Sequence, residues 1–118
     1  MLSNNVPNSV YLACGSTDMR KSIDGLAAMV TFSFKLDVFS DCLFVFCNRG
    51  RNKLKILYWD TAGFWLYYRR LEKGRFRWPE QDASGTISIS QRQLGWLLSG
   101  LSLEQHQAHR EVTARKVA

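Results

Sequence analysis

Nine basic residues lie within one stretch of this 118-residue chain, and only Asp60 and Glu72 oppose them there. Residues 49–77 therefore have a net charge of +7, whereas the whole chain has +6 and the remainder −1. Clustered ammonium and guanidinium groups bind polyanions because they release the counterions condensed on phosphates. Nucleic acid is thus the expected ligand class. The nine are Arg49, Arg51, Lys53, Lys55, Arg69, Arg70, Lys73, Arg75 and Arg77.

Aromatic residues concentrate in nearly the same stretch, and planar rings stack on bases or wedge between them. Trp65, Tyr67 and Trp78 are the candidates for such contacts. A solvated basic surface above an aromatic core explains the interleaving equally well at this point. Ten of the fifteen aromatic residues are involved: Phe44, Phe46, Tyr58, Trp59, Phe64, Trp65, Tyr67, Tyr68, Phe76 and Trp78.

Residue patterns typical of catalysis or metal binding are missing from the sequence. His106 and His109 have helical i, i+3 spacing, but nothing nearby in sequence completes a metal site. Asp18, Asp24 and Asp60 are scattered over predicted caps and turns, whereas metal-dependent phosphoryl transfer needs converging carboxylates. We therefore expect no enzyme activity, no metal and no cofactor.

Composition predicts one globular domain, because 46% of the residues are hydrophobic and the chain is long enough to bury a core. We expect this domain to span residues 1–101, with 102–118 as a flexible or partner-ordered tail. The three cysteines form no C-x-x-C pair, and no apolar run is long enough to cross a bilayer. The first residues also lack a secretory leader, so the expected location is cytoplasmic.

Hydrophobic periodicity predicts an α+β fold: an antiparallel β-meander of four or five strands flanked by two helices. Thr17 or Asp18 is expected to cap a helix whose apolar positions extend from Met19 to Phe34. Ser90 and Gln93 form a capping-box pattern at the start of the second helix. That helix would bury Leu94, Leu97, Leu98 and Leu101. The expected strands are Ser9–Cys14, Cys42–Asn48, Leu54–Trp59, Phe64–Leu71 and, more weakly, Thr86–Ile89.

The turn at residues 60–63 has Asp first and Gly last, a pattern typical of a type I turn followed by a left-handed bulge. That turn would place Asp60 opposite Phe64 and Trp59 beside Trp65. It would also place Leu57 beside Tyr67, and Lys55 beside Arg69. The face with both tryptophans is then either a binding surface or a second core layer, and both interpretations remain open.

Two basic segments are expected to project from this meander. The polar turn of residues 48–53 forms a basic tip between two strands. In the extended segment after Gly74, Arg75 and Arg77 would point to one side and Phe76 and Trp78 to the other. These two segments supply five of the nine cations.

Several runs resemble the TnpB accessory proteins of insertion-sequence family sixty-six, which are small proteins encoded beside a separate transposase. The resemblance covers about nine tenths of the chain. The sequence departs from the family pattern at Val38, where proline is common, at Asp41, where glycine is common, and after Gly100. The matching runs are Asp18–Leu26, Leu43–Phe46 with Asn48 and Arg49, Lys55–Asp60, Gly63–Leu66, Arg70–Phe76, Trp78–Pro79, and Gln93 and Leu94 with Leu97, Leu98 and Gly100.

The resemblance implies a non-catalytic bacterial protein that assists the movement of an insertion sequence and is encoded beside a separate transposase. Together with the basic stretch, it makes DNA and the transposase the expected partners. In our main hypothesis the nine cations contact DNA phosphates. The first alternative is a protein-interaction module that docks on the transposase through the Trp59 and Trp65 face. A metal-assisted nuclease using Asp18, Asp24 or Asp60, and binding of RNA instead of DNA, are further alternatives.

Overall fold

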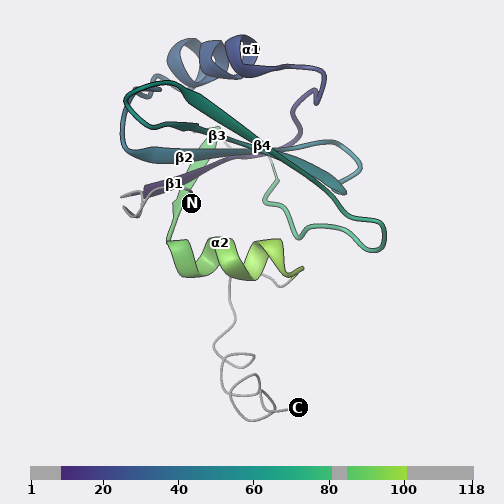
Figure 1. Cartoon of the computed structure of the whole chain (residues 1–118). Coiled ribbons are helices and arrows are strands. Elements are labelled where there is room, and N and C mark those ends of the chain that lie inside the picture. The colour runs from purple at the N-terminus through teal and green to yellow at the C-terminus, as the bar shows by residue number, and fades with distance from the viewer. Residues whose placement is uncertain (1–8, 81–84, 101–118) are drawn as a thin grey trace.

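The computed structural model describes residues 9–80 and 85–100. Within them, a mixed five-stranded sheet in the order β4-β3-β2-β1-β5 lies between two helical layers, α1 on one face and α2 on the other (Figure 1). This confirms the predicted α+β class with two helices. No helix in these residues is long and apolar enough to cross a membrane. The strands are β1 (Ser9–Ala13), β2 (Cys42–Cys47), β3 (Lys53–Trp59), β4 (Phe64–Arg70) and β5 (Thr86–Ile89).

Three of the four strand pairings are antiparallel, and the predicted meander is confirmed for β2, β3 and β4. The exception is that β1 pairs parallel with β2, with Ser9 opposite Cys42. The connection between them contains α1 (Ile23–Ala28) and a π-helical turn, η1 (Met29–Ser33), which cover one face of the sheet. A parallel pair needs such a crossover, because its strands start at the same end.

The central strands of the sheet are buried on both faces, so their alternate residues enter two separate cores. In β2, Leu43, Val45 and Cys47 pack toward α2, whereas Phe44 and Phe46 pack toward α1. This explains why the strand is apolar at nearly every position instead of alternating. Edge strand β4 is more exposed than these central strands, and its Trp65 is 40% exposed.

The pairing of β3 with β4 differs by one residue from the predicted register. Trp59 lies opposite Phe64, so Trp65 is opposite Tyr58 and on the other face of the sheet from Trp59. The predicted pair of Leu57 with Tyr67 is wrong for the same reason, and Lys55 lies opposite Tyr68, not Arg69. No common Trp59 and Trp65 face exists.

The cause of this difference is the conformation of the turn. The residue with positive φ is Thr61, at 75°, where a bulge at Gly63 was expected. The Asp60 carboxylate accepts hydrogen bonds from the Ala62 and Gly63 backbone N–H groups, both at 2.9 Å, and from Trp65 Nε1 at 2.7 Å. All four residues from 60 to 63 therefore form the loop, and pairing starts at Trp59.

Helix α1 begins at Ile23, later than predicted, and its N-cap is Ser22. Asp18 does not cap it, since the Asp18 carboxylate accepts from the backbone N–H of Arg20 at 2.9 Å. Lys55 Nζ donates to the carbonyl oxygens of Met19 and Lys21, at 2.7 and 2.8 Å. Side-chain bonds of this kind compete with helical backbone bonds and hold residues 18–21 in a loop.

Helix α2 (Gln91–Leu98) has the predicted capping box, in which Ser90 Oγ accepts from the Gln93 N–H and the Gln93 side chain accepts from the Ser90 N–H. Its buried residues are Leu94 and Leu97. Gly100 follows with φ of 82°, a conformation that suits glycine after a helix. Leu101, His106, His109 and the expected tail 102–118 lie outside the described residues.

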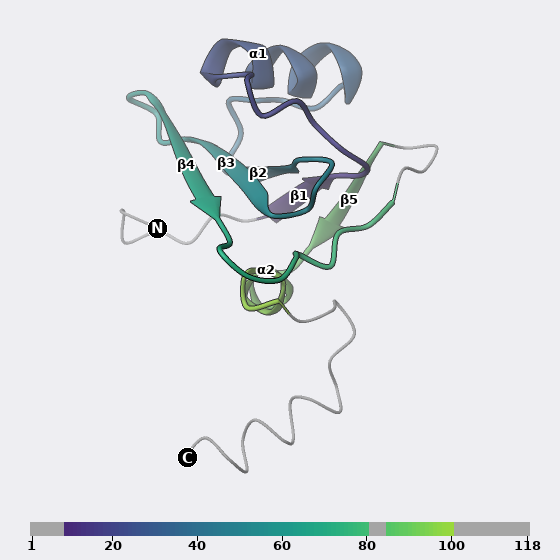
Figure 2. The ribbon, with the colours of Figure 1, turned by 90° about the vertical axis from the view of Figure 1, so that its right-hand side faces the viewer.

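Residues 71–80 connect edge strand β4 to the opposite side of the sheet, and we call them the strap. Figure 2 shows the strap leaving β4 and passing beneath the sheet beside α2 toward β5. Phe76 and Trp78 are buried in the α2-side core, at 1% and 4% exposure, whereas Arg75 and Arg77 are exposed. The predicted alternation is thus confirmed. Trp78 Nε1 donates to the Ala13 carbonyl at 2.9 Å, which fixes the strap to β1.

Candidate nucleic-acid interface

The β2–β3 tip is a compact polar turn. Asn48 Oδ1 accepts from the backbone N–H groups of Asn52 and Lys53, at 3.0 and 3.1 Å. Asn48 Nδ2 also donates to Asn52 Oδ1 at 2.9 Å, and Arg51 has φ of 62°. The two asparagines satisfy the turn internally, so its basic side chains are left to face solvent.

Backbone hydrogen bonds bring the strap against this tip. The Leu71 N–H donates to the Asn52 carbonyl at 2.8 Å, and the Phe76 N–H donates to the Arg51 carbonyl at 2.7 Å. In the sheet, Lys53 lies opposite Arg70. Cations that are far apart in sequence therefore meet at one end of the sheet. We call this group the basic end: Arg49, Arg51, Lys53, Arg69, Arg70, Lys73, Arg75 and Arg77.

Only two members of the basic end have a carboxylate partner within the described residues. Arg70 Nε donates to Glu72 at 2.8 Å, and Arg51 lies 3.8 Å from Glu80. Glu72 raises the pKa of Arg70 through this hydrogen bond, but both groups are exposed, so the pair adds little stability. The other six cations form no ion pair in the described part of the chain and remain available to an external anion.

Lys55 differs from the other predicted phosphate-binding cations. Two of its three N–H donors are used by the Met19 and Lys21 carbonyls, and the side chain is only partly exposed. This side chain ties the loop before α1 to the sheet. Its main role is thus structural, although its charge has no carboxylate partner in the described residues.

We predict that Lys55→Met lowers the free energy of unfolding by about 1–2 kcal/mol, because two carbonyl groups lose their charged donor. Lys53→Met is the matched control, since Lys53 is on the same face of β3. It should change the free energy by less than about 0.5 kcal/mol. Urea denaturation of both variants measures the difference, and equal midpoints would contradict the tethering role.

The three aromatic candidates differ in burial and in their partners. Trp78 is buried and hydrogen-bonded, so the expected stacking on bases by this ring is wrong. Trp65 and Tyr67 stack on each other with centroids 6.0 Å apart, on the α2 side of β4. Burial raises the pKa of the Tyr67 hydroxyl, and the nearby Tyr58 and Asp60 add to this effect. In the sheet they lie beside Tyr58 and Ile56 of β3 and not beside Lys53 at its basic end.

The opposite end of β3 is aromatic and acidic. Phe39 packs edge-on against Trp59 with centroids 5.0 Å apart, and Phe64 lies against both rings. A hollow of about 350 Å³ there is lined in part by Asp41 and Asp60. The hydrogen bond from Trp65, followed by those from the backbone N–H groups of Ala62 and Gly63, holds the pKa of Asp60 below its usual value. This end therefore contrasts in charge with the basic end.

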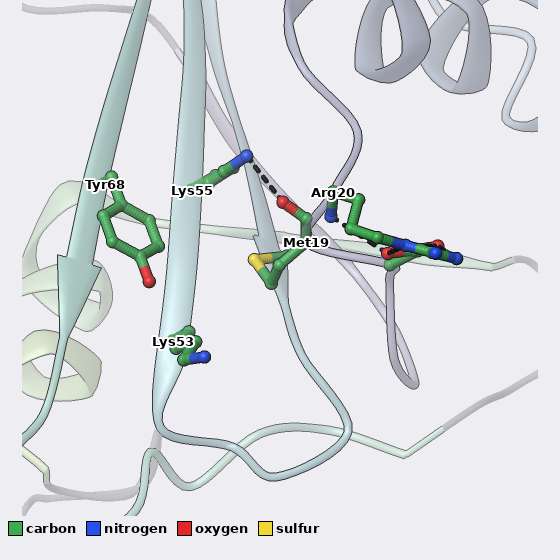
Figure 3. Close-up of a pocket in the computed structure, with 6 residues that line it drawn as sticks. Met19, Arg20, Lys53, Lys55 and Tyr68 are labelled. Atoms are coloured by element: carbon green, nitrogen blue, oxygen red, sulfur yellow. Dashed lines mark hydrogen bonds and ion pairs between the residues drawn. The ribbon is translucent and has the colours of Figure 1, made fainter.

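An open pocket of about 550 Å³ adjoins the basic end on the α1 side of the sheet. Figure 3 shows Met19 and Arg20 on one side, Tyr68 on the other, and Lys53 and Lys55 on the strand between them. Arg20 forms a close ion pair with Asp18, at 2.7 Å, and this hydrogen bond lowers the pKa of Asp18 to about 2.

Tyr68 was not among the predicted site residues. The correct register, which sets it opposite Lys55, is the signal that would have found it.

The sequence matches the family described as IS66 Orf2 like protein over residues 8–108. The chain belongs to this family. The match confirms the resemblance to the TnpB accessory proteins of this insertion-sequence family, and it extends past the domain boundary expected at residue 101.

Two bacterial relatives from Sinorhizobium fredii (strain NBRC 101917 / NGR234) share this sequence pattern. Uncharacterized protein y4hO is 42% identical over 92 residues, which cover 78% of this chain and 79% of the relative. Uncharacterized protein y4jC is 29% identical over 92 residues, with 78% of each chain covered. No solved structure matches the chain.

In this IS66 Orf2-like chain, the carboxylates considered for a nuclease do not converge. Asp18 pairs with Arg20, Asp60 closes the β3–β4 turn, and Asp24 lies on α1. Within residues 9–80 and 85–100, no group of three metal-ligating side chains comes together.

Proposed function

We propose that this accessory protein binds DNA non-catalytically during transposition, with the basic end on the phosphates. The observation that supports this proposal is the gathering of six cations without carboxylate partners, within the described residues, around the β2–β3 tip and the strap. The membership of the family gives the context, since an insertion sequence moves as DNA.

The geometry suits a backbone contact more than base-specific recognition. The cations of the basic end project from fixed backbone positions. The tip is held by hydrogen bonds, and the strap is held by its buried side chains Phe76 and Trp78. Phosphate contacts position a protein on DNA without reading the sequence. We therefore propose general affinity for duplex DNA, with the transposase as the second partner.

The salt dependence of binding tests this proposal. If the six unpaired cations each contact one phosphate, the plot of log K against log salt for a random-sequence duplex should have a slope of about −5. Fluorescence anisotropy measures this slope between 50 and 300 mM salt. Over roughly this range the association constant should fall by several orders of magnitude. A flat plot would refute phosphate binding.

A second candidate function is docking on the transposase through the aromatic and acidic end. Phe39 and Trp65 support it, since their side chains are 59% and 40% exposed. Large exposed rings are enriched where proteins bind one another. A pull-down with the transposase that survives high salt, together with no affinity for duplexes of element-end or random sequence, would select this function over DNA binding.

A further inference from the structure

The pocket beside the basic end has one exposed aromatic wall. Tyr68 lies on β4, the edge strand of the sheet, and 54% of its surface is exposed. Met19 lines the pocket from the facing loop (Figure 3), and the pocket is open to solvent. A flat exposed ring opposite a polarisable thioether accepts another planar group well.

The charge of the pocket favours an anion. Three of its side chains are cationic, Arg20, Lys53 and Lys55, and Asp18 is the one carboxylate among its lining residues. Asp18 is already bound by Arg20 through both carboxylate oxygens, at 2.7–3.1 Å. Lys55 Nζ is 5.9 Å from the centroid of Tyr68, and Lys53 lies nearer the tip. An aromatic wall with excess positive charge matches a base attached to a phosphate.

The volume agrees with this ligand class, since about 550 Å³ lies in the range of roughly 300–1,000 Å³ for small-molecule sites. A base within a duplex has both of its faces covered by neighbours, so it cannot stack on Tyr68. Both Asp18 carboxylate oxygens are bound by Arg20, so this carboxylate is occupied by an internal partner. We therefore expect the base to be held mainly by stacking, which is tolerant of its identity.

We infer that this pocket holds one unpaired nucleotide of DNA, with its base stacked on Tyr68 and its phosphate beside Lys53, so that the protein prefers DNA with a single-stranded extension. This inference rests on the proposed binding of DNA by the basic end. It adds that the protein distinguishes frayed or processed DNA ends from continuous duplex.

The experiment compares a blunt duplex with the same duplex bearing a five-nucleotide single-stranded extension, by anisotropy at fixed salt. Stacking of one base predicts roughly tenfold tighter binding of the extended duplex. Tyr68→Ala should abolish this preference and leave the affinity for the blunt duplex within about twofold, whereas Tyr68→Phe should keep the preference because the ring remains. Phe32→Leu, which removes a ring that is exposed on η1 and does not line the pocket, is the control and should keep the preference as well.

The outcomes separate this inference from the proposed function. Equal affinity of the wild type for both duplexes, or an unchanged preference in Tyr68→Ala, overturns the pocket assignment and leaves duplex binding intact. Absence of binding to either duplex overturns the proposed function. Two competition results would overturn the assignment to DNA. In one, single-stranded RNA competes tenfold better than DNA of the same sequence. In the other, a free deoxynucleoside monophosphate competes as well as the extended duplex.

Discussion

Replacing Arg75 and Arg77 together by glutamate should weaken duplex binding by at least about a hundredfold at 0.1 M salt. Each charge-assisted hydrogen bond to a phosphate contributes about 1.5–3 kcal/mol, and the reversed charges also repel the backbone. The slope of log K against log salt should become shallower by about two units, one for each lost contact. The fold should be retained, because both arginines are exposed and have no ion-pair partner in the described residues.

A double variant elsewhere controls for net charge. Lys35→Glu with Arg92→Glu changes the charge by the same amount at exposed positions outside the basic end. It should reduce affinity only slightly, because the interaction between distant charges is screened beyond about 10 Å at this salt concentration. If both double variants lose equal affinity, binding depends on overall charge and the strap is not part of the interface.

Removing the Trp78 side chain should have the largest effect on stability. Trp78→Ala is expected to lower the free energy of unfolding by about 3–5 kcal/mol, since the ring is 4% exposed and packs in the α2-side core. The change also removes the donor to the Ala13 carbonyl, the bond that fixes the strap to β1. Guanidinium denaturation followed by circular dichroism measures the loss.

Two further variants separate packing from hydrogen bonding at Trp78. Trp78→Phe keeps most of the buried area but leaves the Ala13 carbonyl without its partner, so the expected loss is about 1–3 kcal/mol. Trp65→Ala removes a tryptophan that is 40% exposed and should cost less than Trp78→Ala. An unchanged denaturation midpoint in Trp78→Ala would mean that the strap is not anchored as the structure has it.

The strands and the second helix could be predicted from local sequence because their signals are local. Apolar runs bounded by polar turns placed the five strands within one or two residues at each end. The Ser90 capping box needs only the residues of one helical turn, and it is present. The alternation of Arg75, Phe76, Arg77 and Trp78 also predicted correctly which side chains are buried.

The failures occurred where particular side-chain hydrogen bonds, and not hydrophobic periodicity, decided the conformation. The late start of α1 depends on Lys55, which is 34 residues from Lys21 and donates a hydrogen bond to the Lys21 carbonyl oxygen. The register of β3 and β4 depends on a carboxylate that binds two backbone N–H groups and a tryptophan, and the turn composition alone does not specify this arrangement. The pocket at Tyr68 could not be predicted, because it needs that register together with the loop before α1.

Opposite charges at the two ends of β3 form an electric dipole along this strand. Lys53 begins the strand at the basic end and Trp59 ends it beside Asp41 and Asp60, roughly 20 Å away at about 3.3 Å per residue. The field of a polyanion orients such a dipole during approach, before any contact forms, and this steering raises the association rate. Once aligned, the molecule would turn Phe39 and Trp59 outward from the nucleic acid. One protein could then act as an adaptor, with its positive pole on the polyanion and its negative pole presented to a second macromolecule.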